Sequence, residues 1–144
     1  MATGKRVDPY RGARFLVEID GITQAGFQEV SGLDVTVDPV EYREGSDPAH
    51  PRKLPGMTKY GNITLKHGIT DSDELWKWHQ TVVDGKPVRR NGSIILLDDT
   101  GTERLRWNFF NAWPSKWTGP AFNATSAAVA IETLELTQEE MRKA

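Results

Sequence analysis

Apolar and polar residues alternate in several short stretches of this chain, a pattern typical of half-buried β-strands. Residues 14–19 are rich in β-branched and aromatic side chains and end at Asp20-Gly21, a dipeptide that favours two-residue hairpin turns. The return strand would carry Ile22, Phe27 and Val30. The N-terminal pattern therefore predicts a hairpin of two strands.

Two further stretches alternate strictly between apolar and polar side chains. In residues 33–38 and 63–66, every second residue is apolar and the residues between them are polar. Each stretch predicts a strand with one packed face and one wet face. The apolar positions are Leu33, Val35, Val37, Ile63 and Leu65, and the polar positions are Asp34, Thr36, Asp38, Thr64 and Lys66.

The segment at about 44–56 contains three prolines and almost nothing that could be buried. It predicts a loop or an arm. Structureless connections of this length are uncommon in compact domains and are usually functional or disordered. We expect this one to be ordered only against something outside its own domain.

One helix is predicted at about 71–84. Asp71 or Ser72 is suited to cap its N-terminus, and Gly85 is placed to end it. Leu75, Trp78 and Val82 follow a spacing of three and four residues, so they form one apolar stripe. This stripe should lie on the apolar face of a sheet.

The C-terminal half predicts further strands. Residues 93–97 and 104–111 form a hairpin pattern across the turn residues 99–101, and residues 127–136 read as a last strand with a bulge near Glu132-Thr133. The charged tail 138–144 is expected to be a frayed helical end. The predicted fold is mainly β with one α-helix, an antiparallel β-sandwich or split barrel in a single domain over 1–144.

The most concentrated apolar feature is the aromatic segment 107–117. It holds three of the five tryptophans and two phenylalanines, and each ring can remove about 150–250 Å² from water. Such a segment builds either a core or an interface, and both remain open on the pattern alone.

Composition narrows the class of protein. Cysteine is absent, and 18 basic residues stand against 20 acidic residues for a net charge of −2. No overall field therefore attracts nucleic acid or anionic lipid. There is no apolar stretch that would serve as a signal peptide or a membrane span, so we expect a protein assembled in the cytoplasm with no stable membrane association.

Candidate catalytic chemistry is sparse. The three histidines, His50, His67 and His79, lie outside any nucleophile or zinc motif, and Asp98-Asp99 reads as a turn before it reads as a carboxylate pair. We predict no enzyme activity, no catalytic residue, no cofactor and no metal. Basic residues near exposed aromatics leave one alternative from another class, a small β-barrel module that binds a ligand or nucleic acid.

Several motifs, in the same order and spacing, resemble the inner-tube family of contractile tails, which occurs in phages and in phage-tail-like injection systems and is related in fold to the type VI secretion tube protein. They cover nearly the whole chain. Phe110 is a departure, because a polar or basic residue is expected there. The motifs lie at 8–21, 27–33, 41–45, 52–56, 63–68, 89–94 and 107–117, the last reading Trp-Asn-Phe-Phe-Asn-Ala-Trp-Pro-Ser-Lys-Trp.

The resemblance implies a non-enzymatic subunit whose sheets join neighbours into a hexameric ring barrel, with rings stacked inside a contractile sheath. The partners it implies are further copies of the chain, the sheath, baseplate or spike proteins, and cargo effector or DNA in the lumen. A baseplate tube initiator of the same fold is the alternative within the family. The particle could be released outside the cell.

The resemblance also assigns residues. The wet positions would line the lumen, namely Asp34, Thr36 and Asp38, or the comparable Thr64 and Lys66, while Val35, Val37, Ile63 and Leu65 would pack beneath the helix. The 44–56 arm would reach a neighbouring ring, and a Trp-Pro-Ser-Lys-Trp turn would leave the domain edge to meet a neighbour. The interface candidates are Arg52, Lys53, Leu54, Trp113 and Trp117.

Overall fold

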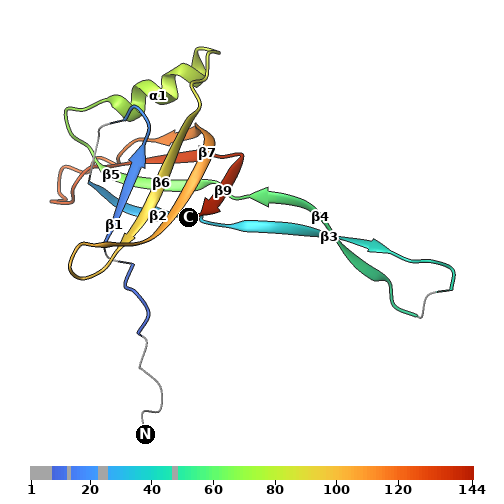
Figure 1. Cartoon of the computed structure of the whole chain (residues 1–144). Helices are drawn as coiled ribbons and strands as arrows, with labels where there is room; N and C mark the ends of the chain where they lie inside the picture. The colour runs from blue at the N-terminus through green and yellow to red at the C-terminus, as the bar shows by residue number, and fades with distance from the viewer. Residues whose placement is uncertain (1–7, 13, 23–25, 47–48) are drawn as a thin grey trace, which may run out of the picture.

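Nine strands and one helix are present in the residues that the computed structural model describes, which are 8–12, 14–22, 26–46 and 49–144. One seven-stranded sheet folds at β7 into the two layers of a sandwich, and a separate two-stranded sheet forms an arm that extends far from it (Figure 1). The elements are β1 (Phe15–Ile19), β2 (Phe27–Ser31), β3 (Val35–Tyr42), β4 (Arg52–Tyr60), β5 (Ile63–Gly68), α1 (Glu74–Val83), β6 (Arg90–Leu97), β7 (Glu103–Thr118), β8 (Ile131–Thr137) and β9 (Glu140–Lys143).

Strand β7 belongs to both layers of the sandwich. Its first part pairs with β6 and β9, and β6 pairs with β1, which makes one layer. Its last part, from Trp113 onward, pairs with β8 in the second layer, whose order continues through β5 to β2. The strand turns the corner at Asn111, where φ is 53°. Asparagine tolerates this left-handed conformation, and the Asn91 side chain accepts a hydrogen bond from the Asn111 N–H at 3.0 Å.

The core lies between the two layers and beneath α1. Phe109 from β7 and Trp78 from α1 are its largest fully buried side chains. Ile63 and Leu65 from β5 and Leu134 and Leu136 from β8 complete it, with Leu75 from the helix and Ile19 and Ile94 from the other layer. As predicted, Ile63 and Leu65 are buried in the same core as the helix residues Leu75 and Trp78.

Gly92 in β6 is required by close packing. A Cβ there would lie 2.3 Å from the Phe109 ring and 2.5 Å from the backbone oxygen of Glu18. We expect Gly92→Ala to lower the free energy of unfolding by about 1–3 kcal/mol, the usual range for overpacking. Chemical denaturation measures this loss. Gly12→Ala, at a glycine with open space around it, is the matched control, and an equal loss in both variants would contradict the packing argument.

Helix α1 lies across one end of the sandwich (Figure 1). Leu75 and Trp78 are buried as the spacing predicts, and Val82 is half-buried. The helix begins later than expected, with Asp73 at the N-cap, and neither Asp71 nor Ser72 caps it. Gly85 ends the helix as predicted, because its N–H bonds the Val82 carbonyl at 3.1 Å. The Trp78 indole N–H is satisfied by the Val88 carbonyl at 2.7 Å.

Four expectations from the sequence, three from its pattern and one from the resemblance, are wrong. β1 and β2 do not form a hairpin, because only Ile19 and Ile22 bridge while β1 pairs with β6 and β2 with β5. The strand predicted at 127–136 is β8 (Ile131–Thr137). Its pairing with β5 is regular through Glu132 and Thr133, and the irregularity lies in the partner strand β7, between Pro114 and Lys116. The C-terminal tail is strand β9, not a helical end. The Trp-Pro-Ser-Lys-Trp segment is not a turn but part of β7.

Candidate assembly surface

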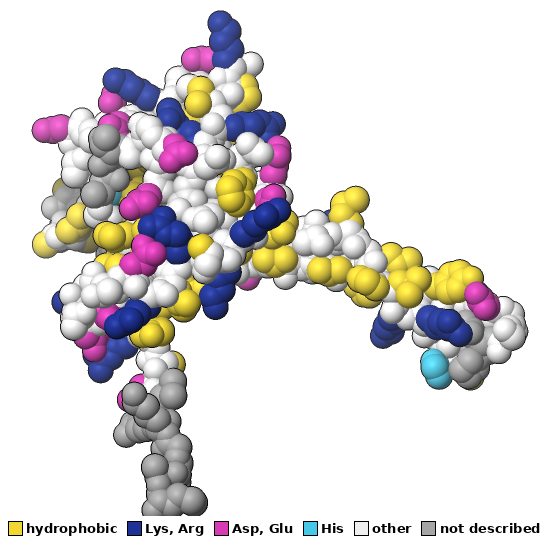
Figure 2. Space-filling model, in the orientation of Figure 1, with side chains coloured by type: hydrophobic (Ala, Val, Ile, Leu, Met, Phe, Trp, Pro, Cys, Tyr) yellow, Lys and Arg dark blue, Asp and Glu magenta, His cyan; other side chains and the backbone are white. Residues whose placement is uncertain are grey.

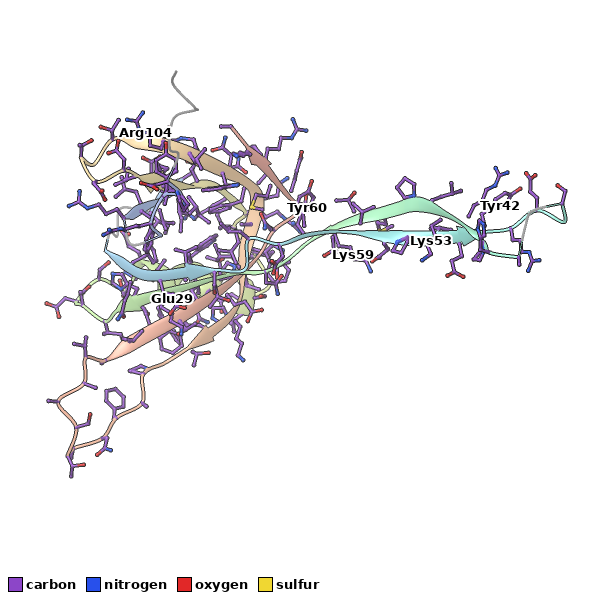
Figure 3. The ribbon with its side chains drawn as sticks, turned by 90° about the horizontal axis from the view of Figure 1, so that it is seen from below. Glu29, Tyr42, Lys53, Lys59, Tyr60 and Arg104 are labelled. Carbon is purple, nitrogen blue, oxygen red and sulfur yellow. The ribbon has the colours of Figure 1, made fainter. Side chains whose placement is uncertain are left out.

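The arm is a β-hairpin and is longer than the predicted 44–56 segment. Among the described residues, strands β3 and β4 pair only with each other, from Val35↔Tyr60 at the root to Tyr42↔Arg52 near the tip (Figure 3). Two of its prolines lie in the paired ribbon, where Pro39 is opposite Pro55. Proline cannot donate a ladder hydrogen bond, which blunts a strand edge against unspecific pairing.

The apolar residues of the arm are exposed. Val35 and Val37 are 52% and 46% exposed, so the expectation that they pack beneath the helix is wrong for the single chain. The alternation in 33–38 correctly marks a strand but not a strand packed on its own domain. Figure 2 shows hydrophobic side chains along the length of the arm. The described members are Val35, Val37, Val40, Tyr42, Leu54 and Met57.

A glycine sets the root of the arm. Gly32 has a φ of +89°, and a Cβ on it would lie 2.0 Å from the Asn62 carbonyl oxygen. The Asp34 carbonyl accepts the Gly61 N–H at 2.8 Å, and the Gln138 side chain donates to the Gly61 carbonyl at 3.0 Å. The two strands that leave the sandwich are therefore tied together and tied to its body.

The layer made of β2, β5, β8 and the end of β7 has a polar outward face. Burial alternates strictly in β5 and β8, so Thr64 and Lys66 point outward while Ile63 and Leu65 point inward. The register places Thr64 between Ser31 and Glu135, and Lys66 between Glu29 and Thr133. The Lys66 ammonium lies 3.3 Å from a Glu29 carboxylate oxygen. Lys116 is paired with Glu135, so positive and negative side chains are balanced on this face.

The two groups of predicted lumen residues do not lie on the same surface. Thr64 and Lys66 lie together on the polar outward face. Asp34, Thr36 and Asp38 lie at the root and along the first half of the arm. There the Asp38 carboxylate forms an ion pair with the Lys59 ammonium at 2.9 Å. Sequence reasoning missed Glu29, Glu135 and Lys116 as members of the polar face. The alternation of polar and apolar residues in 133–137 was the available signal for Glu135.

The same layer has two free edges among the described strands. β2 pairs only with β5, and residues 113–118 of β7 pair only with β8. All three pairings in this layer are antiparallel. The two edge strands therefore run in opposite directions. A second copy could add its β7 edge to the β2 edge of the first, and the antiparallel alternation would continue without interruption.

The two tryptophans at the end of β7 point in different directions. Trp113 is paired with Thr137, whereas Trp117 is paired with the buried Leu134. Trp117 donates its indole N–H to Glu132 at 2.9 Å and packs edge-on against Trp76, with ring centroids 4.6 Å apart. Both tryptophans are half-buried. Trp117 thus contributes mainly to the subunit, while Trp113 stays a predicted interface residue.

Glu132 lies at the centre of a buried polar group. Its carboxylate oxygens lie 3.6 Å from His67 Nδ1 and 2.9 Å from the Trp117 indole nitrogen. The His67 ring in turn meets Phe27 from β2 edge-on, at 5.4 Å between centroids. These contacts connect β2, β5, β8 and the end of β7. The buried histidine and the buried carboxylate are therefore explained by their structural role in joining these strands, without a catalytic role.

The β6–β7 turn holds a strongly perturbed carboxyl group. The Thr100 hydroxyl, the Thr102 N–H and the Arg104 guanidinium hydrogen-bond Asp98 and hold its pKa well below the usual range. Its contribution to folding is therefore complete above its unfolded pKa, near 4, and is lost as the pH falls through the lower folded pKa. The turn anchors the hairpin as the pattern at 99–101 predicts.

Asp98→Asn is expected to lower the melting temperature at pH 7 and to lower it less at pH 3 and below. The reason is that acid removes the favoured carboxylate from the parent protein as well. Thermal unfolding followed by circular dichroism between pH 2 and pH 7 measures the difference, with Asp99→Asn as the neighbouring control. A difference that does not shrink in acid would contradict the assignment.

The described part of the chain contains no cluster of three or more histidine and acidic side chains arranged to hold a metal ion. No helix in the described ranges is long and apolar enough to span a membrane. His50 lies in the exposed connection of the arm, His67 in the core and His79 half-buried in α1. The structure does not bring the three histidines together.

Comparisons with known proteins agree with this geometry. The family model of the T4-like virus tail tube protein gp19 matches residues 11–142. No match was found among proteins of curated function. The chain is similar to a chain in the cryo-EM structure of an extracellular contractile injection system, the PVC sheath-tube complex in its extended state. The identity is 32% over 94% of this chain and 91% of that chain, with a TM-score of 0.84.

Two further solved structures are similar to this chain. A chain of the anti-feeding prophage tube-terminating cap is 27% identical over 99% of this chain and 95% of that chain, with a TM-score of 0.87. Hcp1 from Flavobacterium johnsoniae is 20% identical over 89% and 94%, with a TM-score of 0.55, and shares the fold. The fold is that of the tail tube proteins. The chain belongs to the T4-like tail tube protein family.

Proposed function

We propose that this chain is the inner-tube subunit of a contractile injection system, closing into hexameric rings that stack into a conduit. The observation that carries ring closure is the pair of free edges on one layer, β2 on one side and the end of β7 on the other. Because these edges differ, their contact is heterologous, and a heterologous contact closes a ring when its rotation closes. Four alternating strands per copy keep the joined sheet antiparallel throughout.

In this arrangement the polar face of the closed sheet lines the lumen. Thr64 and Lys66 would point into it together with Glu29, Glu135 and Lys116. Its balanced charges give no strong field of one sign, which suits a passive conduit for cargo effectors or DNA. For Asp34, Thr36 and Asp38 the assignment to the lumen stays a prediction that concerns the arm. The subunit would perform no chemistry of its own.

The outer partners follow from the same proposal. A contractile sheath would surround the tube, and baseplate or spike proteins would cap one end. The likeness to a chain of the PVC sheath-tube complex supports the sheath as a partner. The particle would be assembled in the cytoplasm and act outside the cell. The arm residues Arg52, Lys53 and Leu54, together with Trp113, are the proposed contacts between copies.

A baseplate tube initiator is the second candidate. A chain of the anti-feeding prophage baseplate is 27% identical over 96% of this chain, with a TM-score of 0.83, so the fold fits both positions. Copy number separates them. Quantitative mass spectrometry of purified particles should find this chain at a number similar to the sheath protein if it forms the tube, and at only a few copies if it is an initiator.

Ring closure is tested by native mass spectrometry of the purified chain. We expect a species of six times the 16.1 kDa chain mass to dominate at high concentration, alone or after addition of baseplate components. A protein that stays monomeric under both conditions would contradict the proposed function. Salt-dependent binding of single-stranded oligonucleotide by such a monomer would instead favour the small binding module.

A further inference from the structure

The connection between β7 and β8, residues 119–130, is the most exposed apolar feature outside the arm. Phe122 is 87% exposed and Val129 is 75% exposed. Residues 117–131 form the longest stretch of the chain without a charged side chain. A phenylalanine can bury about 150–250 Å², so this loop, hereafter the Phe122 loop, presents an unused apolar contact.

The Phe122 loop is ordered by its own hydrogen bonds. The Asn123 side-chain oxygen accepts the Thr125 N–H at 3.0 Å and the Thr125 hydroxyl at 2.8 Å. The Asn123 carbonyl also accepts the Ser126 N–H at 3.1 Å. The turn beside Phe122 is therefore formed before any partner binds, which lowers the entropy lost on binding.

The Phe122 loop and the arm lie at opposite ends of the same layer. In the β5–β8 pair, Ile63↔Leu136 is nearest the arm and Gly68↔Ile131 is nearest the loop. The two views agree that the arm and the segment between β7 and β8 project to opposite sides (Figures 1 and 3). About six residues of strand, roughly 20 Å, separate the two ends.

This placement determines which surfaces of two rings face each other when the rings stack. When identical rings stack head to tail, the arm end of one ring must face the loop end of the next. The cross-strand pair Val40 and Leu54 forms an exposed apolar site on the outer half of the arm, and Met57, three residues farther along β4, is 73% exposed. An uncharged loop can cover this apolar site at lower cost than a charged loop, because no charged side chain of the loop is removed from water.

We infer that the Phe122 loop receives the arm of a subunit in the adjacent ring, with Phe122 packing on the Val40–Leu54 pair. The inference rests on the proposed tube function and names the partner surface of the arm. Each contact is expected to bury only a few hundred Å², less than a stable isolated dimer needs. A ring joint repeats it once per subunit, and this multiplicity provides the missing area.

Cysteine pairs test the contact directly, because the chain has no cysteine of its own. Tubes of a chain that carries both Phe122→Cys and Leu54→Cys should oxidise to a ladder of linked chains on a non-reducing gel. A second pair, Phe122→Cys with Met57→Cys, covers a shift along the arm. The matched control joins Phe122→Cys to Leu16→Cys, an exposed apolar residue on β1, and should give no ladder.

The outcomes separate this contact from the function on which it rests. Ladders from either arm pair, but not from the control, support the contact. Tubes that form normally without a ladder from either arm pair, or with an equal ladder from the control, would overturn the contact and leave the tube function intact. Failure of the parent chain to form rings or tubes, even with baseplate components, would overturn both.

Substitution of Phe122 gives an independent measurement. Phe122→Ser should leave hexameric rings intact in native mass spectrometry and abolish long tubes in electron micrographs. Phe122→Tyr keeps the aromatic side chain and should form long tubes as the parent does. Normal tubes from Phe122→Ser, or loss of hexamers together with tubes, would contradict a role confined to ring stacking.

Discussion

Deletion of residues 46–54 is expected to abolish tube stacking while leaving the sandwich folded. The deletion removes Arg52, Lys53 and Leu54 from β4, and these side chains are exposed. β3 and β4 pair with each other and not with the seven-stranded sheet, so the core around Phe109 is unaffected. We expect a melting temperature close to that of the parent, hexamers in native mass spectrometry and no long tubes in electron micrographs.

A length-preserving control separates the strand from its connection. Replacing residues 46–50 with Gly and Ser keeps 52–54 in place, so this variant should still stack. Loss of folding in the deletion variant would show that the arm belongs to the core. Normal tubes from the deletion variant would show that the arm makes no essential contact between rings.

The second large effect concerns the core. Phe109→Ala is expected to cost about 3–5 kcal/mol of unfolding free energy, because Phe109 is fully buried between the two layers. That is a large share of the 5–15 kcal/mol typical of a whole domain. Equilibrium denaturation with guanidinium measures it. Phe110→Ala removes the adjacent ring from the same strand, where the side chain is half-buried, and should cost clearly less.

Phe109 and Gly92 also predict a measurable coupling. The Cβ that Gly92→Ala introduces clashes first with the Phe109 ring, and removal of that ring opens space for it. The cost of Gly92→Ala should therefore be smaller in the Phe109→Ala background than in the parent. Strictly additive costs would mean that the Glu18 backbone oxygen, and not the ring, makes glycine necessary at position 92.

Local pattern was sufficient for the elements whose partners are close in sequence. The apolar stripe of α1 and the β6–β7 hairpin were predicted because a turn or a helical period fixes which residues face the core. The burial of Ile63 and Leu65 was predicted from the two-residue alternation of a strand. The identity of the protein family came from a set of motifs and not from the physics of any one of them.

Pattern failed where distant partners decide. Asp20-Gly21 is a good hairpin turn, yet every residue of β1 pairs with β6, which lies far along the chain. Val35 and Val37 alternate like core residues although the arm holds them away from the core. We propose that another copy of the chain covers them. A single sequence contains no direct signal for that partner.

The aromatic segment 107–117 illustrates both outcomes. Its length in one strand allows β7 to turn at Asn111 and serve two layers, so one segment supplies Phe109 to the core and Trp113 to the other layer. Core and interface were both reasonable interpretations of the composition. The strand register sets, for each residue, whether it faces the core. The pattern of apolar residues around Pro114 does not reveal that register.

Electron microscopy of the purified chain tests the central claim most directly. We expect negative-stain images, with the chain alone at high concentration or with baseplate components, to contain six-fold rings and stacked tubes. A reconstruction of these tubes should place Thr64 and Lys66 on the lumen wall and the arm between successive rings. Featureless monomeric particles under both conditions, or rings whose lumen is lined by the opposite layer, would contradict the account.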